Sequence, residues 1–590
     1  MTKTTTQFRL VLLQAVAVLL FFNTASAATY TAVTSGNYNA ASTWQGGLVP
    51  PTSVSGDNIV IPTGIGVQLN QNVELKSGAS LTVIGSLVST TGNSLSIVNS
   101  SLTGTGNITV DSFAANFTTG FTYTGTLTTK IFNSSNAVIG AASNIFISEK
   151  LYLRGGTMAI NAGSVTLTGT NNTIIVEGGS VTVSGASLSL TTDYNVIYQN
   201  ANATTGLELS GSGLKNIDVN VGGGKTVSLG ADLVVNGTLN LTSGTLSLNN
   251  NNLTFNATGN LGAGGGGVFY STSGSDITVN STTGLSDNLR FTTGGNTVDD
   301  FTINLGDSTA KVGIESETNV SGTLSLQSGR VDVDNNKLAL QPGAMVSGGS
   351  AKSYVITSGG GSLAMQVTGG SAETFHVGTN NRYTPATVNS VSGSVNSVFG
   401  VSAFGDVKAV GSTGETVAAT QPVVSNTWMI APNTATGVTA DIELYWHADM
   451  EVNSFNRAMA YISHYTGGNW DTYGAAAATV ASNGMYKISR MGLTSFSPFA
   501  VFDQNTKVSV NNITADKGVD IYPNPASNTL YIRNASNATA EIVNIAGKKV
   551  LSTEVSNNTG IDISTLSNGL YFIRLSGDDV KATFKFIKRQ

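Results

Sequence analysis

The sequence predicts an all-β protein in which a right-handed parallel β-helix, a solenoid, is followed by a β-sandwich and a small C-terminal β-sandwich. Three observations predict this fold class. Short runs of alternating apolar residues recur at a regular step, glycine (69 residues) and asparagine separate them, and one stretch of the chain is repeated further on. Glycine and asparagine at this spacing disfavour helix interiors, whereas strands joined by tight corners accommodate both.

The composition points to a neutral surface. Only 11% of the 590 residues are charged, and the net charge is −6. Serine, threonine, asparagine and glycine must therefore supply the polar positions, as solvent-facing strand residues and turns do. No basic stripe is present, which argues against a nucleic-acid partner. The sequence has no cysteine, which excludes disulfides, thiolate metal sites and cysteine nucleophiles.

The N-terminus predicts export. Lys3 and Arg9 precede an apolar run at 10–22, and Ala25 and Ala27 fit the small-residue rule for signal-peptide cleavage. The run is shorter than the about 20 residues that span a bilayer, so we expect a signal peptide at 1–27 and no membrane anchor. No later segment is long and apolar enough to cross a membrane.

Residues 28–70 predict an irregular N-terminal cap that ends in a first strand. Apolar residues are scattered here until the run at 59–61. A solenoid needs such a cap, because its first coil exposes an unpaired strand edge and an open core.

Residues 71–368 carry the repeats of the predicted β-helix. Each run places two apolar residues on one strand face, and successive runs begin seven to nine residues apart. The runs are Val165/Leu167, Ile174/Val176, Val181/Val183 and Leu188/Leu190, then Leu239/Leu241, Leu246/Leu248 and Leu253/Phe255, then Leu324/Leu326, Val331/Val333 and Leu338/Leu340. Shifting the chain by 85 residues aligns 235–253 with 320–338, and 10 of 19 positions are identical. Repetition at this scale indicates a solenoid.

Parallel stacking explains these runs better than hairpins do. Three short strands in a coil of about 21–24 residues suit a β-helix, whereas hairpin loops would return each strand beside its predecessor. The paired aliphatic residues would point inward, and asparagine runs such as 249–252 would occupy corners. The competing interpretation is a chain of β-sandwich modules, which the shortage of hairpin dipeptides disfavours.

Residues 369–503 change in character. Aromatic residues become frequent and the regular step disappears, which is typical of a compact β-sandwich. Trp428, Trp446 and Trp470 could form a glycan-stacking platform, or they could fill the core of the sandwich. Residues 504–517 are polar and form a predicted linker.

Residues 518–590 contain seven short strand-like runs, which suit a further small sandwich. Their distinctive positions are Tyr522, Pro523, Asn524, Pro525, Gly547, Gly569, Tyr571 and Lys585. In order, spacing and terminal position these residues resemble the C-terminal sorting domain of type IX secretion system cargo of the Bacteroidetes. We take them as the candidate sorting signal.

The resemblance implies passage across the inner membrane by the signal peptide and across the outer membrane by the type IX machinery. It further implies removal of the domain by a sortase-like protease, attachment to anionic lipopolysaccharide, and a secreted or outer-membrane cell-surface location. An address of this kind says nothing about the activity of the cargo. More loosely, the segment 44–62 and the repeated G-T-L-x-L text are similar to adhesin-like surface proteins of the same bacteria.

One pair of residues is a candidate metal site. Asp332 and Asp334 alternate on a predicted strand, so a Ca²⁺ ion could bridge them with help from Asn335; the other interpretation is a solvated face. No other cofactor is predicted. The three histidines, His376, His447 and His464, fit no metal motif.

The charges in 71–368 are few and dispersed, without the carboxylate cluster that proton transfer or glycoside cleavage needs. We therefore expect a structural or adhesin-like surface protein and no enzyme. The alternative is an extracellular carbohydrate-binding protein that acts through 369–503.

Overall fold

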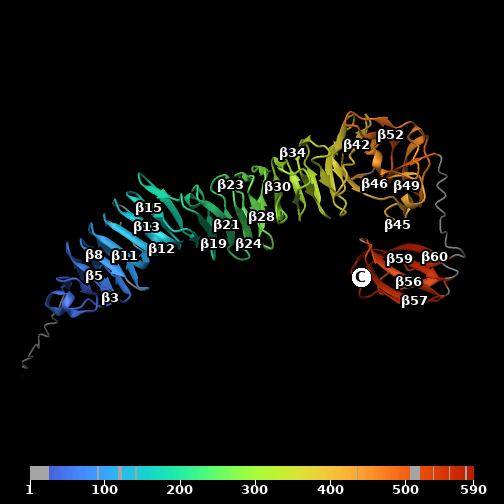
Figure 1. Cartoon of the computed structure of the whole chain (residues 1–590). Coiled ribbons are helices and arrows are strands. Elements are labelled where there is room, and N and C mark those ends of the chain that lie inside the picture. Colours follow the sequence, from blue (N-terminus) through green and yellow to red (C-terminus); the bar gives the residue numbers. More distant parts are fainter. Residues whose placement is uncertain are drawn as a thin grey trace, which may run out of the picture. The chain divides into compact units, whose positions relative to one another are not determined.

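The structure is a computed structural model that describes residues 26–89, 92–116, 123–139, 142–434, 436–504, 519–535, 537–545, 547–556, 558–577 and 581–589. It confirms the predicted fold class: the chain is all-β, with a β-solenoid of about 14 turns over 53–378 and β-sheets toward the C-terminus (Figure 1). The chain divides into two compact units between Val227 and Ser228, and each is described by itself.

The first unit begins with a strand that pairs onto the solenoid. β1 (Thr29–Thr31) runs parallel to β4 (Asn58–Ile61), which pairs with β7 (Ser80–Val83) and through it with β10 (Ser101–Thr103). Trp44 and Tyr38 are both buried beside this start, with their rings 5.4 Å apart and the Trp44 indole N–H donating to the Tyr38 carbonyl oxygen at 2.7 Å. The scattered aromatic residues of the predicted cap thus close the first coil.

Within the first unit, parallel strands stack equivalent inward-facing positions on one another. One face is built from β5 (Gly66–Leu69), β8 (Ser86–Ser89), β11 (Asn107–Asn116), β12 (Thr126–Ile139), β13 (Asn144–Leu153) and β15 (Ser164–Leu167). Their registers align Val67, Leu87, Ile108, Leu127, Ile145 and Val165 in one column. All six side chains are buried. Each contributes about 1.5–3 kcal/mol of hydrophobic stabilisation, so the column supplies a core without disulfides.

In the second unit, the seven-residue step of the sequence marks successive faces of a coil. β24 (Thr238–Ser243) and β26 (Leu253–Phe255) each contain one of the predicted apolar pairs, and β25 (Thr245–Ser247) contains Leu246, with Leu248 directly after its end. Every member of the three pairs is buried. β25 pairs in parallel with β28 (Val268–Ser271), and β26 with β29 (Ile277–Val279). The prediction that these pairs point inward is therefore confirmed.

The 85-residue repeat does not correspond to a whole number of coils. β23 (Leu233–Val235) lies in the six-stranded sheet, whereas its copy, β33 (Thr318–Val320), lies in the 14-stranded sheet. The six-stranded sheet instead contains β34 (Thr323–Ser328), which is the copy of β24. The duplicated segment has therefore been placed one face further around the solenoid, where the same inward pair fits equally well.

A ladder of Asx side chains links five coils of the second unit at one corner. Each carboxyl or carboxamide oxygen accepts a hydrogen bond from the backbone N–H of the equivalent residue 20 to 24 positions later. The bonds run from Asn252 N to Asp232 Oδ1 (2.8 Å), Asp276 N to Asn252 Oδ1 (2.9 Å), Asp300 N to Asp276 Oδ1 (3.1 Å) and Thr323 N to Asp300 Oδ1 (2.6 Å). The ladder satisfies corner amides that the strand hydrogen bonds leave free.

Removing one side chain of this ladder tests how much the ladder contributes to stability. We expect Asp276→Ala to lower the free energy of unfolding by about 1–2 kcal/mol, because the Asp300 N–H loses its acceptor. Asp276→Asn retains an acceptor oxygen and should be nearly neutral. Thermal unfolding followed by circular dichroism measures both. Ser273→Ala, an exposed change on the same coil, is the control; an unchanged midpoint for Asp276→Ala would contradict the role of the ladder.

The sandwich of the second unit grows directly from the solenoid. β39 (Ser362–Val367) pairs in parallel with β36 (Lys337–Leu340) of the preceding coil and antiparallel with β43 (Ser397–Phe404) on its other edge. The same sheet continues through β46 (Val423–Pro432), β53 (Phe499–Asp503) and β49 (Ala460–Thr466). One hydrogen-bonded sheet therefore belongs to both architectures.

The second sheet of the sandwich is antiparallel throughout. Its order is β40 (Ala372–Phe375), β42 (Ala386–Ser390), β47 (Ala440–Trp446), β52 (Tyr486–Leu493) and β51 (Thr479–Val480). Between β40 and β42, the short β41 (Val377–Gly378) still pairs in parallel with β38 (Val355–Ile356) of the solenoid. The solenoid and the sandwich thus interleave over 362–378, so the predicted boundary at 368 passes through the shared segment.

The C-terminal domain has the seven strands that the sequence predicts. One sheet contains β54 (Asp520–Tyr522), β55 (Thr529–Arg533) and β58 (Gly560–Asp562). The other contains β57 (Lys549–Val555), β56 (Ala538–Asn544), β59 (Gly569–Gly577) and β60 (Lys581–Lys588). Their inward residues form one core, centred on Leu530, Ile542 and Ile573. The predicted linker 504–517 lies outside the described residues except for Gln504.

Candidate functional sites

The segment 522–526 of the C-terminal domain is fixed to the last strand by the side chain of Asn524 and the backbone of Ala526. Asn524 Nδ2 donates to the carbonyl oxygen of Lys585 at 2.8 Å, and Asn524 Oδ1 accepts from the Ile587 N–H at 3.0 Å. Beyond it, Ala526 N donates to the Ile587 carbonyl oxygen at 2.9 Å. The carboxamide therefore replaces a strand partner along the edge of β60, and a residue without both a donor and an acceptor cannot do this.

The other candidate sorting residues lie around this segment or in the core. Tyr522 stacks on Tyr531 with ring centroids 5.5 Å apart, and Pro523 and Pro525 are exposed on either side of Asn524. Tyr571 is buried against Phe586, and its hydroxyl donates to the Ser567 carbonyl oxygen at 2.9 Å.

The two glycines are fixed by the backbone conformation that they allow, whereas Lys585 has an exposed side chain. Gly547 has a φ of +74° in the turn between β56 and β57, a conformation that favours glycine. Gly569 begins β59, and Lys585 has an exposed side chain on β60. The eight predicted residues thus define one folded domain with an exposed Pro-Asn-Pro segment.

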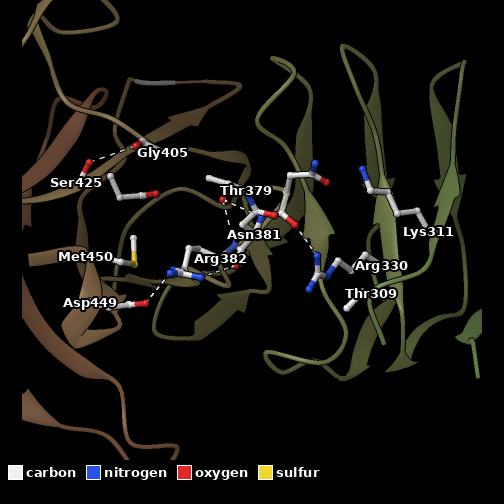
Figure 2. A pocket seen from close by; sticks show the side chains of 12 residues that line it. Thr309, Lys311, Arg330, Thr379, Asn381, Arg382, Gly405, Ser425, Asp449 and Met450 are labelled. Carbon is white, nitrogen blue, oxygen red and sulfur yellow. Dashed lines mark hydrogen bonds and ion pairs between the residues drawn. The ribbon is translucent and has the colours of Figure 1, made fainter. Parts of the chain in front are cut away.

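A second candidate site is a polar groove where the last coils meet the sandwich, here called the junction groove. It has a volume of about 780 Å³. Thr309, Lys311 and Arg330 of the solenoid lie on one side, Gly405, Ser425, Asn426, Asp449 and Met450 of the sandwich on the other, and the loop 379–382 lies between them. Figure 2 shows the labelled side chains of the two sides facing each other across this loop.

The junction groove continues into a second hollow of about 490 Å³, which shares Asn381, Arg382 and Asp449. The ion pair between Arg382 Nη2 and Asp449 Oδ2, 2.6 Å long, lies where the two hollows meet. Both partners are about half exposed, so this pair contributes little to stability and can exchange for a ligand contact.

The three tryptophans fill the core of the sandwich, so of the two interpretations of these residues the glycan-stacking platform is wrong. Trp428 and Trp446 are fully buried and Trp470 is 5% exposed. Each indole N–H already has a partner: Trp428 donates to the Thr384 carbonyl oxygen at 2.9 Å, Trp446 to Glu451 Oε1 at 2.8 Å and Trp470 to the Lys408 carbonyl oxygen at 2.8 Å. Their ring faces are therefore covered by protein, and a sugar cannot stack on them.

The structure also separates the two candidate calcium ligands. β35 (Arg330–Asp332) ends at Asp332, and Asp334 follows in a corner with a φ of +44°, so the two do not alternate on one strand. Asp332 Oδ2 forms an ion pair with Lys311 at 3.1 Å, and the ammonium group opposes a cation there. Among the residues that the structure describes, no group of three His, Cys, Asp or Glu side chains could hold a metal ion.

The three histidines have different surroundings. His464 stacks on Phe499 with centroids 4.7 Å apart, and burial lowers its pKa. His376 Nδ1 lies 2.5 Å from the Tyr383 hydroxyl, and burial lowers the pKa of His376 from 6.5 to about 4. His447 lines the second hollow.

The lowered pKa of His376 makes the stability of the fold depend on pH. Between pH 6.5 and about 4 the unfolded chain binds a proton at this residue that the folded chain does not, so this contribution to stability is complete above pH 6.5 and falls as the pH falls. We expect a loss of about 2 kcal/mol between pH 7 and pH 5 from this group alone. Thermal midpoints at the two pH values measure it, and His376→Gln should flatten the difference. Identical slopes for both proteins would contradict the assignment.

The sequence did not predict the junction groove. Its residues come from segments more than 100 positions apart, and none of them carries a motif; only the Thr-Asn-Asn-Arg run at 379–382 is locally polar. Ala25 lies outside the described residues, and Ala27 is exposed at the start of the described chain. Among the described residues we find no helix whose length and hydropathy would let it cross a bilayer.

Comparison with known families assigns the C-terminal domain. Residues 520–589 match the family model described as the secretion system C-terminal sorting domain. This confirms the resemblance to type IX secretion cargo and indicates export out of the cell, to the surface or the extracellular space. Searches of curated proteins and of solved structures gave no match.

Proposed function

We propose that this type IX secretion cargo is a non-catalytic structural or adhesive protein of the cell surface. In this proposal the solenoid coils act as a spacer, the sandwich is the module they present, and the sorting domain directs export. The resemblance adds two finer steps to the proposal: cleavage of the sorting domain by a sortase-like protease and attachment to anionic lipopolysaccharide. Mass spectrometry of the exported protein tests the first step, because mature protein should lack peptides from 518–590.

One observation carries the spacer role: the sheet of the last coils continues without interruption into the sandwich. Leu363 of β39 lies opposite Leu338 of the coil on one edge and opposite Val401 of the sandwich on the other. Adjacent hydrogen-bonded strands transmit a load between the two architectures, whereas a flexible linker would let the module swing freely. A presented module on a stiff support is what an adhesive protein needs.

The proposal is tested by comparing attachment of cells that carry the intact protein, no protein, or a protein shortened by one coil. Removing 277–300 brings Phe301 onto Leu253 and preserves the inward column, because Phe301 pairs with Ile277 and Ile277 with Leu253 in the native register. We expect loss of the protein to reduce attachment several-fold and the shortened protein to be exported normally. Unchanged attachment together with polysaccharide cleavage by the purified protein would overturn the proposal.

A second candidate function is carbohydrate binding. The observation that favours it is the junction groove, which is lined by hydroxyl, amide and guanidinium groups of the kinds that bind sugars. Because Lys311 and Arg330 belong to the solenoid, this function would need the coils as well as 369–503.

A further inference from the structure

The junction groove has walls that are held in place before any ligand arrives. The loop 379–382 is closed on itself, because Thr379 N donates to the Arg382 carbonyl oxygen at 2.8 Å and Thr379 Oγ1 accepts from the Arg382 N–H at 3.2 Å. The buried Tyr354 donates its hydroxyl to the Thr379 carbonyl oxygen at 2.9 Å, which ties the loop to the solenoid. A preformed groove loses little entropy when it binds.

Three cationic side chains line the groove, and two of them are already neutralised. Lys311 pairs with Asp332 at 3.1 Å, and Arg382 pairs with Asp449 at 2.6 Å. Arg330 forms no ion pair with any described carboxylate. The nearby Asp307 accepts hydrogen bonds from Thr309 N at 2.7 Å and Thr309 Oγ1 at 2.8 Å, and its carboxylate is held there.

Arg330 is nevertheless fixed in position. Its guanidinium lies over the Tyr354 ring, 5.0 Å from the centroid, and Nη1 donates to the Asn380 carbonyl oxygen. Its Nε is buried and has no hydrogen-bond partner among the described residues. Figure 2 shows Arg330 reaching from its strand toward the loop 379–382. An oriented guanidinium with donors left over is suited to binding a carboxylate.

A second unsatisfied polar atom lies in the opposite wall. Asn426 is fully buried, lines the groove, and its Oδ1 accepts no hydrogen bond from the described residues. Buried acceptors without a partner are rare in folded proteins, and they call for a ligand or a water molecule. Both sides of the groove thus carry polar atoms whose hydrogen bonds are incomplete.

The remaining lining selects the class of ligand. Thr309, Ser425 and Asn381 offer hydroxyl and amide groups that match sugar hydroxyls, and Met450 is the single apolar side chain of the lining. A peptide anchor would need an apolar pocket. The several charges of a polyphosphate would face two cations that are already ion-paired and the carboxylate of Asp449. Arg330 forms no ion pair among the described residues, and it lies with hydroxyl and amide groups in this lining, a combination that fits one carboxylate on a hydroxylated molecule.

We propose that the junction groove binds an acidic glycan, with the carboxylate of a uronic-acid-type residue on Arg330 and its hydroxyls on Thr309, Asn381 and Ser425. This deepens the carbohydrate-binding candidate above and rests on it for the class of ligand. In this proposal the glycan binds at the boundary between the coils and the sandwich, and the buried tryptophans take no part in binding.

The test uses the purified mature protein and short oligomers of galacturonic acid, with their methyl esters as the neutral match. Isothermal titration should give binding of the acid that weakens about tenfold or more for the ester and for Arg330→Gln. Arg154→Gln is the matched control, since Arg154 also lies over a tyrosine, Tyr152, but pairs with Glu177. The control should bind like the native chain.

A second variant keeps the test decisive if Arg330→Gln impairs folding. Asn381→Asp is exposed and nearly isosteric, and it places a carboxylate in the loop beside Arg330. Acid and ester both lose the Asn381 amide contact, but only the acid meets the added repulsion, so binding of the acid should weaken about tenfold more than binding of the ester. Equal binding of acid and ester would overturn the acidic ligand but leave glycan binding standing. Binding of neither would overturn both. Equal binding of a short peptide with a free C-terminal carboxylate would overturn the sugar assignment.

Discussion

Deletion of 520–589 is expected to stop export, and the single change Asn524→Ala is expected to reproduce most of that loss. The deletion removes the domain that matches the sorting family. The point variant removes only the side chain that holds the Pro-Asn-Pro segment on β60. We expect the exported fraction to fall more than tenfold for the deletion and several-fold for Asn524→Ala.

The physical reason lies in two backbone groups. Without the Asn524 carboxamide, the Ile587 N–H and the Lys585 carbonyl oxygen have no partner along that edge of the sheet. Losing both hydrogen bonds costs about 1–3 kcal/mol in a domain of some 70 residues, a size at which total stability is small. Asn524→Asp keeps the acceptor but loses the donor, so it should fall between Asn524→Ala and the native chain.

The measurement is an immunoblot of cell-retained and exported fractions, with limited proteolysis of the purified variants. Asn568→Ala is the matched control, because Asn568 is exposed in the same domain. Native export of Asn524→Ala together with faster proteolysis would show that the segment stabilises the domain but is not needed for sorting.

The sequence was sufficient to predict the solenoid because one physical pattern determines it. Pairs such as Leu253/Phe255 and Leu338/Leu340 can be buried only if each pair faces inward, and parallel stacking at about one coil satisfies this for all of them. The seven strands of the C-terminal domain followed from the same alternation. The pattern carries no information on which face a pair occupies, so the rotation of the 85-residue repeat could not be predicted.

The sites were harder to predict because they depend on burial and on distant contacts. The tryptophan content of 369–503 favours a core but also allows a sugar platform, and only the coordinates reveal that Trp428 is fully buried. Asp332 and Asp334 were two residues apart, but the strand ended between them. At the junction, β39 pairs with a coil of the solenoid on one edge and with a strand of the sandwich on the other, and no local pattern around 362–367 indicates this double pairing.

The largest loss of stability is expected from Glu208→Ala in the first unit. Glu208 lies in the short 3₁₀ helix η3 (Leu207–Leu209) and is 2% exposed. Its Oε1 accepts hydrogen bonds from the Tyr198 hydroxyl at 2.6 Å and from the Gly206 N–H at 2.7 Å. Burial, and after it the negative charge of Glu208, raises the pKa of Tyr198 well above its ordinary value. The phenol therefore keeps its proton and donates a hydrogen bond to the carboxylate.

Truncation to alanine leaves the buried Tyr198 hydroxyl and the exposed Gly206 N–H without this acceptor, and it opens a cavity beside Tyr198. These effects together cost about 3–5 kcal/mol, or about 10 °C in the melting temperature of a unit of this size. Glu208→Gln keeps the volume and one acceptor oxygen, and should lose about half as much. Glu149→Ala, at an exposed position of the same unit, should be neutral.

A double-mutant cycle with Tyr198→Phe separates the hydrogen bond from the packing. Once the Tyr198 hydroxyl is gone, Glu208→Ala no longer leaves it unsatisfied, so the double variant should be more stable than the sum of the single losses predicts. Calorimetry gives the melting temperatures, and hydrogen exchange at β19 (Tyr194–Gln199) locates the change. Strict additivity would mean that the hydrogen bond from the Tyr198 hydroxyl to the Glu208 carboxylate contributes nothing measurable to stability, and the buried pair would then have no role beyond packing.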